Sequence, residues 1–348
     1  MTMLTDRQKA ILSVIVRDYT NTGNPVGSKA LASELNTHVS SATVRNEMAA
    51  LEEKGGLITK THFSSGRVPS MEGYRYYVDH LVQPDPIEDS VEDMIKNSLH
   101  GEFNRIDEII QESARVLSDL TNYMALTFNP ERSDDFKLGG FRLVKLDERQ
   151  VMAILVTQNG HVENQVFQLG DVSSEQLEII VRIINDQLVG KSLSEVSKAL
   201  QFELPALLAQ YVHSPDGFIK IFGDMLNNAS KDRVHVGGKL NLLKFAERQD
   251  LDYLKPLYNL LDTGDGMAKI INPDSNKVQV KIGSELRNDL LKNYSIITGT
   301  YDLKEYGQGV IAVLGPTRMP YSKVIGIVGA LQEELTKKLL GYYENGNR

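Results

Sequence analysis

The side chains with the most informative chemistry follow one another in one short segment: Ser40, Ser41, Thr43, Arg45 and Asn46. An arginine can bind guanine through two hydrogen bonds, and an asparagine can bind adenine in the same way. Hydroxyl groups and the free amides of a first helical turn suit a phosphate, because the N-terminus of a helix favours an anion. These residue types in this order therefore predict contacts with duplex DNA.

A helix is expected to carry this segment. Ser40 can cap it by accepting a hydrogen bond from the amide of Thr43. With about 100° per residue, Met48 and Leu51 fall on the same inward side as Val44. The opposite face and its flanks carry small or polar side chains: Ala42, Thr43, Arg45, Asn46, Ala49 and Glu53.

The preceding residues predict the rest of a helix–turn–helix. Apolar residues at helical spacing indicate one helix over 11–19. A second, short helix is expected over about 28–35, with Ser28 as its N-cap and Lys29 as a further DNA contact. Residues 36–38 make the turn.

A β-hairpin is expected after the third helix. Residues 57–63 alternate like a strand, with Lys60 and His62 on one face, and a Ser-Ser-Gly turn follows. Arg67 begins the return strand, at or beside the tip, where it can enter a minor groove or meet the DNA backbone. The sequence thus predicts a winged helix-turn-helix with these DNA-binding residues: Ser28, Lys29, Ser40, Ser41, Thr43, Arg45, Asn46, Lys60, His62, Ser64, Ser65 and Arg67.

Longer motifs carry a family resemblance. The run SSATVRNEMAALEEKG, followed by HFSSGRVPSMEGYRYYVD, closely resembles the HrcA-type heat-inducible transcription repressors of bacteria. A second match, GVIAVLGPTRMPYSKVIGIV, lies near the C-terminus, so the resemblance covers essentially the whole chain. The sequence departs from the family pattern at one position, where Pro320 stands in place of a residue that is often acidic.

The resemblance implies a function and an architecture. Proteins of this type are homodimers that bind an inverted-repeat operator in front of chaperone operons, and the chaperonin GroEL keeps them active until heat draws it away. The family also has a GAF-like α/β domain that carries a mostly helical dimerisation module. We therefore expect an α+β multidomain protein that binds double-stranded DNA and is cytoplasmic and nucleoid-associated.

Other interpretations stay open. Helix–turn–helix patterns also occur in protein–protein adaptors, where Arg45 and Asn46 simply occupy a solvated face. A second class is a small-molecule-sensing regulator whose GAF-like domain binds a ligand. Of Tyr74, Tyr76 and Tyr77, we expect two to be buried, Tyr74 and Tyr77, rather than to stack on bases.

Hydrophobic patterns place the domains along the chain. The winged helix is assigned to residues 1–82, the GAF-like domain to 83–171 and 236–348, and the inserted module to 172–235. Two helices with serine capping boxes begin the insertion. Strands are expected over 139–146, 151–157, 162–169, 278–282, 295–301 and 309–314, and a helix closes the chain.

One helical stretch allows two interpretations. After a linker at Val82–Pro86, a long helix is expected to about Asn122, with apolar residues at 3-4-3-4-3 spacing: Phe103, Ile106, Ile110, Ser113, Leu117 and Leu120. This pattern is typical of a short coiled-coil seam, or of a helix packed along its own sheet. We favour the insertion as the main dimer contact and place this helix second.

Composition excludes several function classes. The chain of 348 residues has no cysteine, which excludes disulfides, thiolate metal sites and cysteine nucleophiles. Its seven histidines form no HExxH or i,i+4 pair, and no GxGxxG, GxSxG or GxxxxGK(S/T) run occurs. We therefore expect no enzyme activity, metal or cofactor. With no apolar run of about 18 residues and no secretory apolar core, no membrane association is expected.

The charge balance bears on how DNA can be held. Residues 1–80 hold nine Lys or Arg and eight Asp or Glu, a net charge of +1; the whole chain carries −8, so residues 81–348 carry −9. A near-neutral DNA-binding domain has little non-specific affinity for DNA. Specific base contacts and two domains acting on one palindrome are therefore expected, while Glu47 and Glu52 serve as internal partners or face solvent.

Overall fold

The computed structural model describes most of the chain: residues 4–35, 39–53, 55–61, 66–103, 105–129, 137–158, 162–168, 173–211, 216–229, 233–245, 251–262, 267, 270–271, 278–304 and 307–346. It divides into two compact units. The first unit comprises residues 1–129 and 234–348, and the second comprises residues 130–233.

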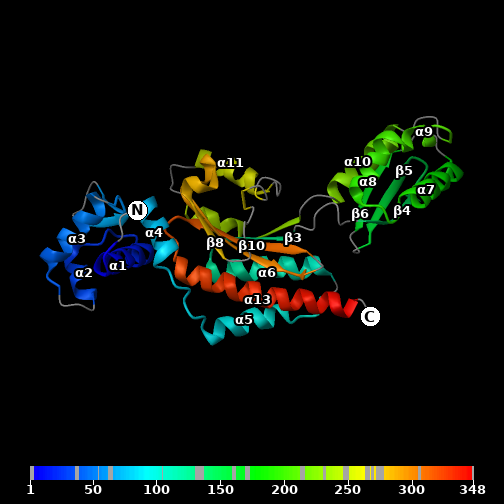
Figure 1. The fold of residues 1–348 in the computed structure, drawn as a ribbon. Coiled ribbons are helices and arrows are strands. Elements are labelled where there is room, and N and C mark those ends of the chain that lie inside the picture. Colours follow the sequence, from blue (N-terminus) through cyan, green and yellow to red (C-terminus); the bar gives the residue numbers. More distant parts are fainter. Residues whose placement is uncertain are drawn as a thin grey trace. The chain divides into compact units, whose positions relative to one another are not determined.

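The first unit begins with a helical bundle and a two-stranded antiparallel hairpin (Figure 1). Its elements are α1 (Asp6–Thr22), α2 (Ser28–Glu34), α3 (Ser41–Glu53), β1 (Ile58–Lys60), β2 (Arg67–Pro69) and α4 (Met71–His80). We call residues 5–81 the head. The predicted order of three helices followed by a hairpin is confirmed.

Local signals position the helices of the head. A capping box joins Thr5 and Gln8 at the start of α1. Before α2 the cap position is held by Gly27 without a side-chain hydrogen bond, so the prediction of Ser28 as N-cap is wrong, and Ser28 is the first helical residue. The cause is the preceding segment: Val26 pairs with Arg67 of β2, which keeps the backbone extended as far as Gly27.

Helix α4 buries a different pair of tyrosines from the expected one. Ser70 caps the helix by accepting from the amide of Gly73 at 3.0 Å. Tyr74 and Tyr76 are buried, whereas Tyr77 is only partly so. Because α4 packs against α1 and β2 as well as against β8 (Gln279–Ile282), more than one side of the helix faces protein.

The rest of the first unit is built on a sheet. Among the described residues, five strands form it in the order β7-β3-β10-β9-β8. The pairs β3–β10, β10–β9 and β9–β8 are antiparallel. Strands were predicted near β8, β9 and β10, but two were missed. The bounds of the four strands not yet given are β3 (Met124–Asn129), β7 (Arg233–Gly237), β9 (Tyr294–Asp302) and β10 (Gln308–Pro316).

Both faces of this sheet are covered. Along β10, Ile311 and Val313 face one apolar cluster while Val310, Ala312 and Leu314 face another, as the two-residue period of a strand requires. The first face carries the helices and the second carries α11 (Leu251–Asp262), as Figure 1 shows. Two helices lie on the first face, α6 (Ile106–Thr121) and α13 (Tyr321–Gly346), and α5 (Asp89–Leu99) packs against both of them. We call residues 89–129 and 234–346 the body.

Helix α6 packs along its own sheet, against β3 and α13, which confirms the second interpretation of the 103–120 pattern. The expected long helix is two helices, α5 and α6. Ile110, Ser113 and Leu117 are buried inside the body, so the coiled-coil interpretation is wrong. The Ser113 hydroxyl donates to the Ile110 carbonyl at 2.7 Å and lies 3.1 Å from the Thr127 hydroxyl on β3. A polar residue at this seam position therefore serves the helix–sheet contact.

The second unit contains a three-stranded antiparallel sheet in the order β4-β5-β6, together with helices. Its described elements are β4 (Leu138–Lys145), β5 (Gln150–Thr157), β6 (Val162–Gln168), α7 (Ser174–Leu188), α8 (Leu193–Phe202), α9 (Leu204–Leu208) and α10 (Asp216–Ala229). The two predicted capping boxes, at Ser173 and Ser192, are both present.

The second unit begins well before the predicted insertion boundary at residue 172. Its sheet pairs only with itself among the described strands, and Phe141, Val151 and Phe167 share an apolar cluster with the helices that follow. The three strands assigned from sequence to the GAF-like domain therefore belong to this unit, and the mostly helical module includes a sheet.

Two residues at the start of the edge strand β4 have their outward backbone groups paired within the second unit. The side-chain amide of Asn185 on α7 accepts from the backbone N–H of Phe141 at 2.8 Å and donates to its carbonyl at 2.9 Å. The N–H of Leu138 donates to the Lys191 carbonyl, and the Leu138 carbonyl accepts from Gly190. These backbone groups on the open side of β4 are thus satisfied.

No helix within the described ranges is long and apolar enough to cross a membrane. Within the same residues, no group of three or more His, Asp or Glu side chains is arranged to hold a metal ion.

A glycine in β10 makes room for a buried ring, and replacing it tests the core of the body. Tyr301 lies opposite Gly309, is fully buried and donates to the Phe128 carbonyl at 2.9 Å. A Cβ on Gly309 would lie 1.9 Å from the tyrosine ring. We expect Gly309→Ala to lower the free energy of unfolding by about 1–3 kcal/mol, measured by urea denaturation, because overpacking forces the ring to move.

The matched control is Gly329→Ala on α13, where a Cβ meets no other atom within 4 Å. Alanine favours a helix over glycine by up to about 1 kcal/mol, so this variant is expected to be neutral or more stable. Equal unfolding midpoints for the two variants would contradict the packing argument.

Candidate nucleic-acid interface

The start of α3 is capped as the sequence predicts. The Ser40 hydroxyl accepts from the amide of Thr43 at 3.1 Å and lies 3.0 Å from the Thr43 hydroxyl. Ser41 is the first helical residue and is half-buried. This cap fixes the direction of the helix and leaves its first turn at the surface, where free backbone amides favour an anion.

Two polar side chains on the exposed face of α3 have no partner among the described residues. Val44, Met48 and Leu51 are buried, which turns Arg45 and Asn46 outward. Neither of these two side chains forms a hydrogen bond or ion pair with another described residue, so both are available to a ligand. Their neighbours on this face are small or polar: Ala42, Ala49 and Glu53.

The inner edge of α3 is tied to α1. Glu47 accepts from the Gln8 side chain at 3.0 Å and lies 3.5 Å from Arg7. Glu47 is therefore an internal partner, as expected. A helix held in this way presents its outer face with little freedom to tilt.

Arg67 does not lie free at the tip of the wing, which contradicts its predicted role as a groove contact. Its Nε and Nη2 atoms lie 2.8 and 2.7 Å from Oε2 of Glu52 on α3, and its side chain is only 11% exposed. Its backbone forms two 2.9 Å hydrogen bonds with Val26. The backbone pairing with Val26 fixes the position of β2 at Arg67. The guanidinium therefore points toward α3 and joins the wing to it through Glu52.

The remaining predicted contacts differ in how they are placed. Lys60 on β1 is 61% exposed and lies 4.0 Å from Glu52, and Lys29 on α2 is exposed. Ser28 is half-buried at the start of α2. His62, Ser64 and Ser65 lie outside the described residues. In the head, Lys29, Arg45, Asn46 and Lys60 are thus exposed, and Ser40, Ser41 and Thr43 lie at the start of α3.

Sequence reasoning missed the contact that orients the wing. Glu52 was expected to be an internal partner or to face solvent, yet its partner could not be named. A signal for it exists in the opposite charges of Glu52 and Arg67, but the strand pairing that brings them together involves Val26, about forty residues earlier in the chain.

Two family models match the chain. The model described as "HrcA protein C terminal domain" matches residues 107–325, and the one described as "LexA DNA binding domain" matches residues 1–65. A crystal structure of a protein described only as hypothetical covers 97% of this chain and 98% of its own, with a TM-score of 0.60 and 23% identity. That likeness concerns the fold alone.

Curated relatives match at full length. Proteins named "Heat-inducible transcription repressor HrcA" from Limosilactobacillus reuteri (strain DSM 20016), Ligilactobacillus salivarius and Enterococcus faecalis are 52%, 51% and 48% identical to this chain. The matches cover 99%, 99% and 98% of this chain and 99% of each relative. The chain therefore belongs to the HrcA family of heat-inducible transcription repressors, with a DNA-binding domain at its start and no enzymatic role.

Proposed function

We propose that this protein represses chaperone operons by binding an inverted-repeat operator as a homodimer in the cytoplasm, with α3 of each head in a major groove. The observation that carries the proposal is the exposed, unpaired pair Arg45 and Asn46 on a helix whose other sides are held by α1 and the wing. Guanidinium and amide groups are the two side-chain types best suited to purine edges.

The weak charge of the head supports binding in pairs. With a net charge of +1 over residues 1–80, one head gains little from the phosphate backbone alone. Two heads on one assembly convert the second binding event into an intramolecular one, which raises affinity without new contacts. An inverted repeat matches such a two-fold assembly.

The second unit offers a face for the dimer. The outer side of its sheet has apolar rows at both ends, since Val144 and Val166 flank Met152 and Val162 lies opposite Val156. The row between them pairs Ile154 with two exposed polar residues, Arg142 and Asn164. Val144, Val162 and Val166 are 40%, 48% and 50% exposed. We assign the dimer contact to this face, and its occupant to the same face of a second copy.

Two further parts of the proposal come from the family resemblance. The body, an antiparallel sheet with helices along its faces, is taken as the GAF-like domain. The chaperonin GroEL is taken as the partner that maintains the active repressor. Operator binding by refolded protein with and without the chaperonin tests this part, and equal active fractions would remove GroEL from the proposal.

The recognition helix is tested by Arg45→Ala and Asn46→Ala. Each is expected to weaken binding to a selected operator by about 1–3 kcal/mol and to relax base preference at one position, because each removes a base contact. The measurement is a titration of labelled duplex, with unfolding midpoints recorded in parallel. Arg149→Ala, an exposed arginine of the second unit, is the matched control.

Wild-type affinity in both variants would show that α3 does not read the bases. Binding that stays constant with salt would point instead to a protein–protein adaptor, because contacts to phosphates weaken steeply as salt rises.

Replacing Glu52, the partner of Arg67, distinguishes a structural role of Arg67 from direct contact with DNA. We expect Arg67→Ala and Glu52→Ala each to lower the free energy of unfolding by about 1–3 kcal/mol, since each removes one partner of a charged hydrogen bond with little exposure to water. Both are expected to weaken operator binding, because the wing loses its position. If Arg67 contacts DNA directly, Glu52→Ala frees the guanidinium and leaves operator affinity unchanged or higher.

The dimer face is tested by Val166→Glu. A carboxylate at this position, which is 50% exposed in the single chain, leaves the unit folded but places a charge in the proposed contact. We expect sedimentation equilibrium to show a loss of dimer by tenfold or more in the association constant, about 1.4 kcal/mol or more. The control is Phe202→Glu on α8, 78% exposed in the same unit, which is expected to stay dimeric. The reverse result would place the contact on α8.

A further inference from the structure

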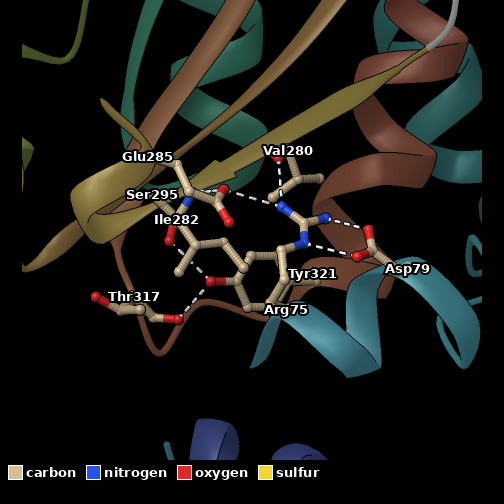
Figure 2. Close-up of polar contacts among 8 residues, drawn as sticks. All are labelled: Arg75, Asp79, Val280, Ile282, Glu285, Ser295, Thr317 and Tyr321. Atoms are coloured by element: carbon tan, nitrogen blue, oxygen red, sulfur yellow. Dashed lines mark hydrogen bonds and ion pairs between the residues drawn. The ribbon is translucent and has the colours of Figure 1, made fainter. Parts of the chain in front are cut away.

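One arginine of the head reaches across to the body. Arg75 on α4 donates from Nη1 to the Val280 carbonyl on β8 at 2.8 Å and to Oε2 of Glu285 at 3.0 Å (Figure 2). Its Nε and Nη2 atoms bind the two carboxylate oxygens of Asp79, one turn along α4, at 3.0 and 2.6 Å. One side of the guanidinium is thus fixed to the head and the other side to the body.

Further hydrogen-bond geometry fixes the two carboxylates that bind Arg75, those of Asp79 and Glu285. Asp79 engages two nitrogens at once, a geometry that only the planar guanidinium allows. Glu285 uses the same Oε2 atom to accept from the backbone N–H of Ile282 at 2.8 Å, which anchors it at the end of β8. Burial disfavours the charged guanidinium, but Asp79 and Glu285 outweigh it and raise the pKa of Arg75. The contact of Arg75 between head and body therefore combines a fixed hydrogen-bond geometry with charge pairing.

An aromatic contact lies beside this arginine. The rings of Tyr74 on α4 and Tyr321 at the start of α13 are 5.8 Å apart at 54°. Burial raises the pKa of the Tyr321 hydroxyl, which stays protonated and donates to the Thr317 carbonyl at 2.7 Å. The same hydroxyl lies 2.8 Å from the hydroxyl of Ser295 on β9 (Figure 2). Tyr321 is therefore a fixed surface against which the head packs.

The segment predicted to be a linker is also bound to the body. The amide of Asp85 donates to the Ser322 carbonyl at 3.2 Å, and the Ser322 hydroxyl donates to the Asp85 carboxylate at 2.7 Å. The same hydroxyl contacts the Gln83 carbonyl. Gly326 allows a close approach, since a Cβ there would lie 2.7 Å from the Asp85 carbonyl oxygen. The chain between head and body is therefore a strap along α13 and not a loose tether.

We propose that Arg75 is a positioning residue for operator binding: by joining Asp79 of the head to Val280 and Glu285 of the body, it sets the angle of each head on its body, and this angle contributes to the half-site spacing that the dimer reads. The inference rests on the proposed function, because spacing has meaning only for two heads on one operator. Apolar contacts such as Tyr74–Tyr321 hold the parts together without direction, whereas hydrogen bonds of a planar fork fix orientation.

The experiment measures affinity as a function of spacing. Full-length protein is titrated with duplexes in which two selected half-sites are separated by spacers that differ by one base pair at a time, and with a duplex that carries one half-site. The variants are Arg75→Lys, which keeps the charge but not the fork, and Glu285→Gln, which keeps a hydrogen-bond acceptor but not the charge. Arg115→Ala is the control, because Arg115 also binds two carboxylates, Glu112 and Asp119, but all within α6.

Wild type and Arg115→Ala are expected to prefer one spacing by roughly ten- to hundredfold, as rigidly joined sites do. Arg75→Lys and Glu285→Gln are expected to reduce that preference to a few-fold while they keep wild-type affinity for the single half-site. An unchanged spacing profile in both variants overturns the inference and leaves the proposed function intact. A loss of half-site binding would assign Arg75 to the stability of the head and also overturns it. If wild type itself prefers no paired site, the proposed function fails and the inference fails with it.

Discussion

The burial of one apolar cluster that runs from the head into the body is the constraint on which the rest of this structure depends. The cluster includes Ile11 and Val44 in the head, Tyr74 on α4, and Val328 and Ile311 in the body. Each large apolar side chain removed from water contributes about 1.5–3 kcal/mol. Polar contacts such as Glu52–Arg67 and Arg75–Glu285 add less free energy, and their effect is to select one orientation of parts that are already held together.

In the proposed mode of operator binding, specificity comes from the fixed geometry of the head more than from its charge. The head carries almost no net charge, so contacts with bases must decide where it binds. Such contacts require α3 and the wing to keep one geometry. Glu47 ties α3 to α1, and Glu52 ties the wing to α3 through Arg67. Glu47 and Glu52 thus hold the geometry of the head, although their negative charges reduce its attraction to DNA.

Sequence patterns were sufficient where the signal is local and insufficient where it depends on distant pairing. Ser40, the capping boxes at Ser173 and Ser192, and the apolar faces of the last strands were predicted because each needs only a few neighbouring residues. Strand β3 is buried on both faces and shows no alternation, so it was missed. The direction of Arg67 depends on pairing with Val26, and the extent of the second unit depends on which strands share a sheet. Neither can be read from one window of sequence.

The partly paired edge of β4 has a consequence for aggregation. An open strand edge is a template on which partly unfolded chains add, and such addition leads to aggregates. Here Asn185 occupies both backbone groups of Phe141, and residues 190–191 occupy those of Leu138. These backbone groups of Leu138 and Phe141 therefore cannot pair with a strand of a neighbouring chain. The first half of this strand edge is therefore unavailable for edge-to-edge addition by another chain.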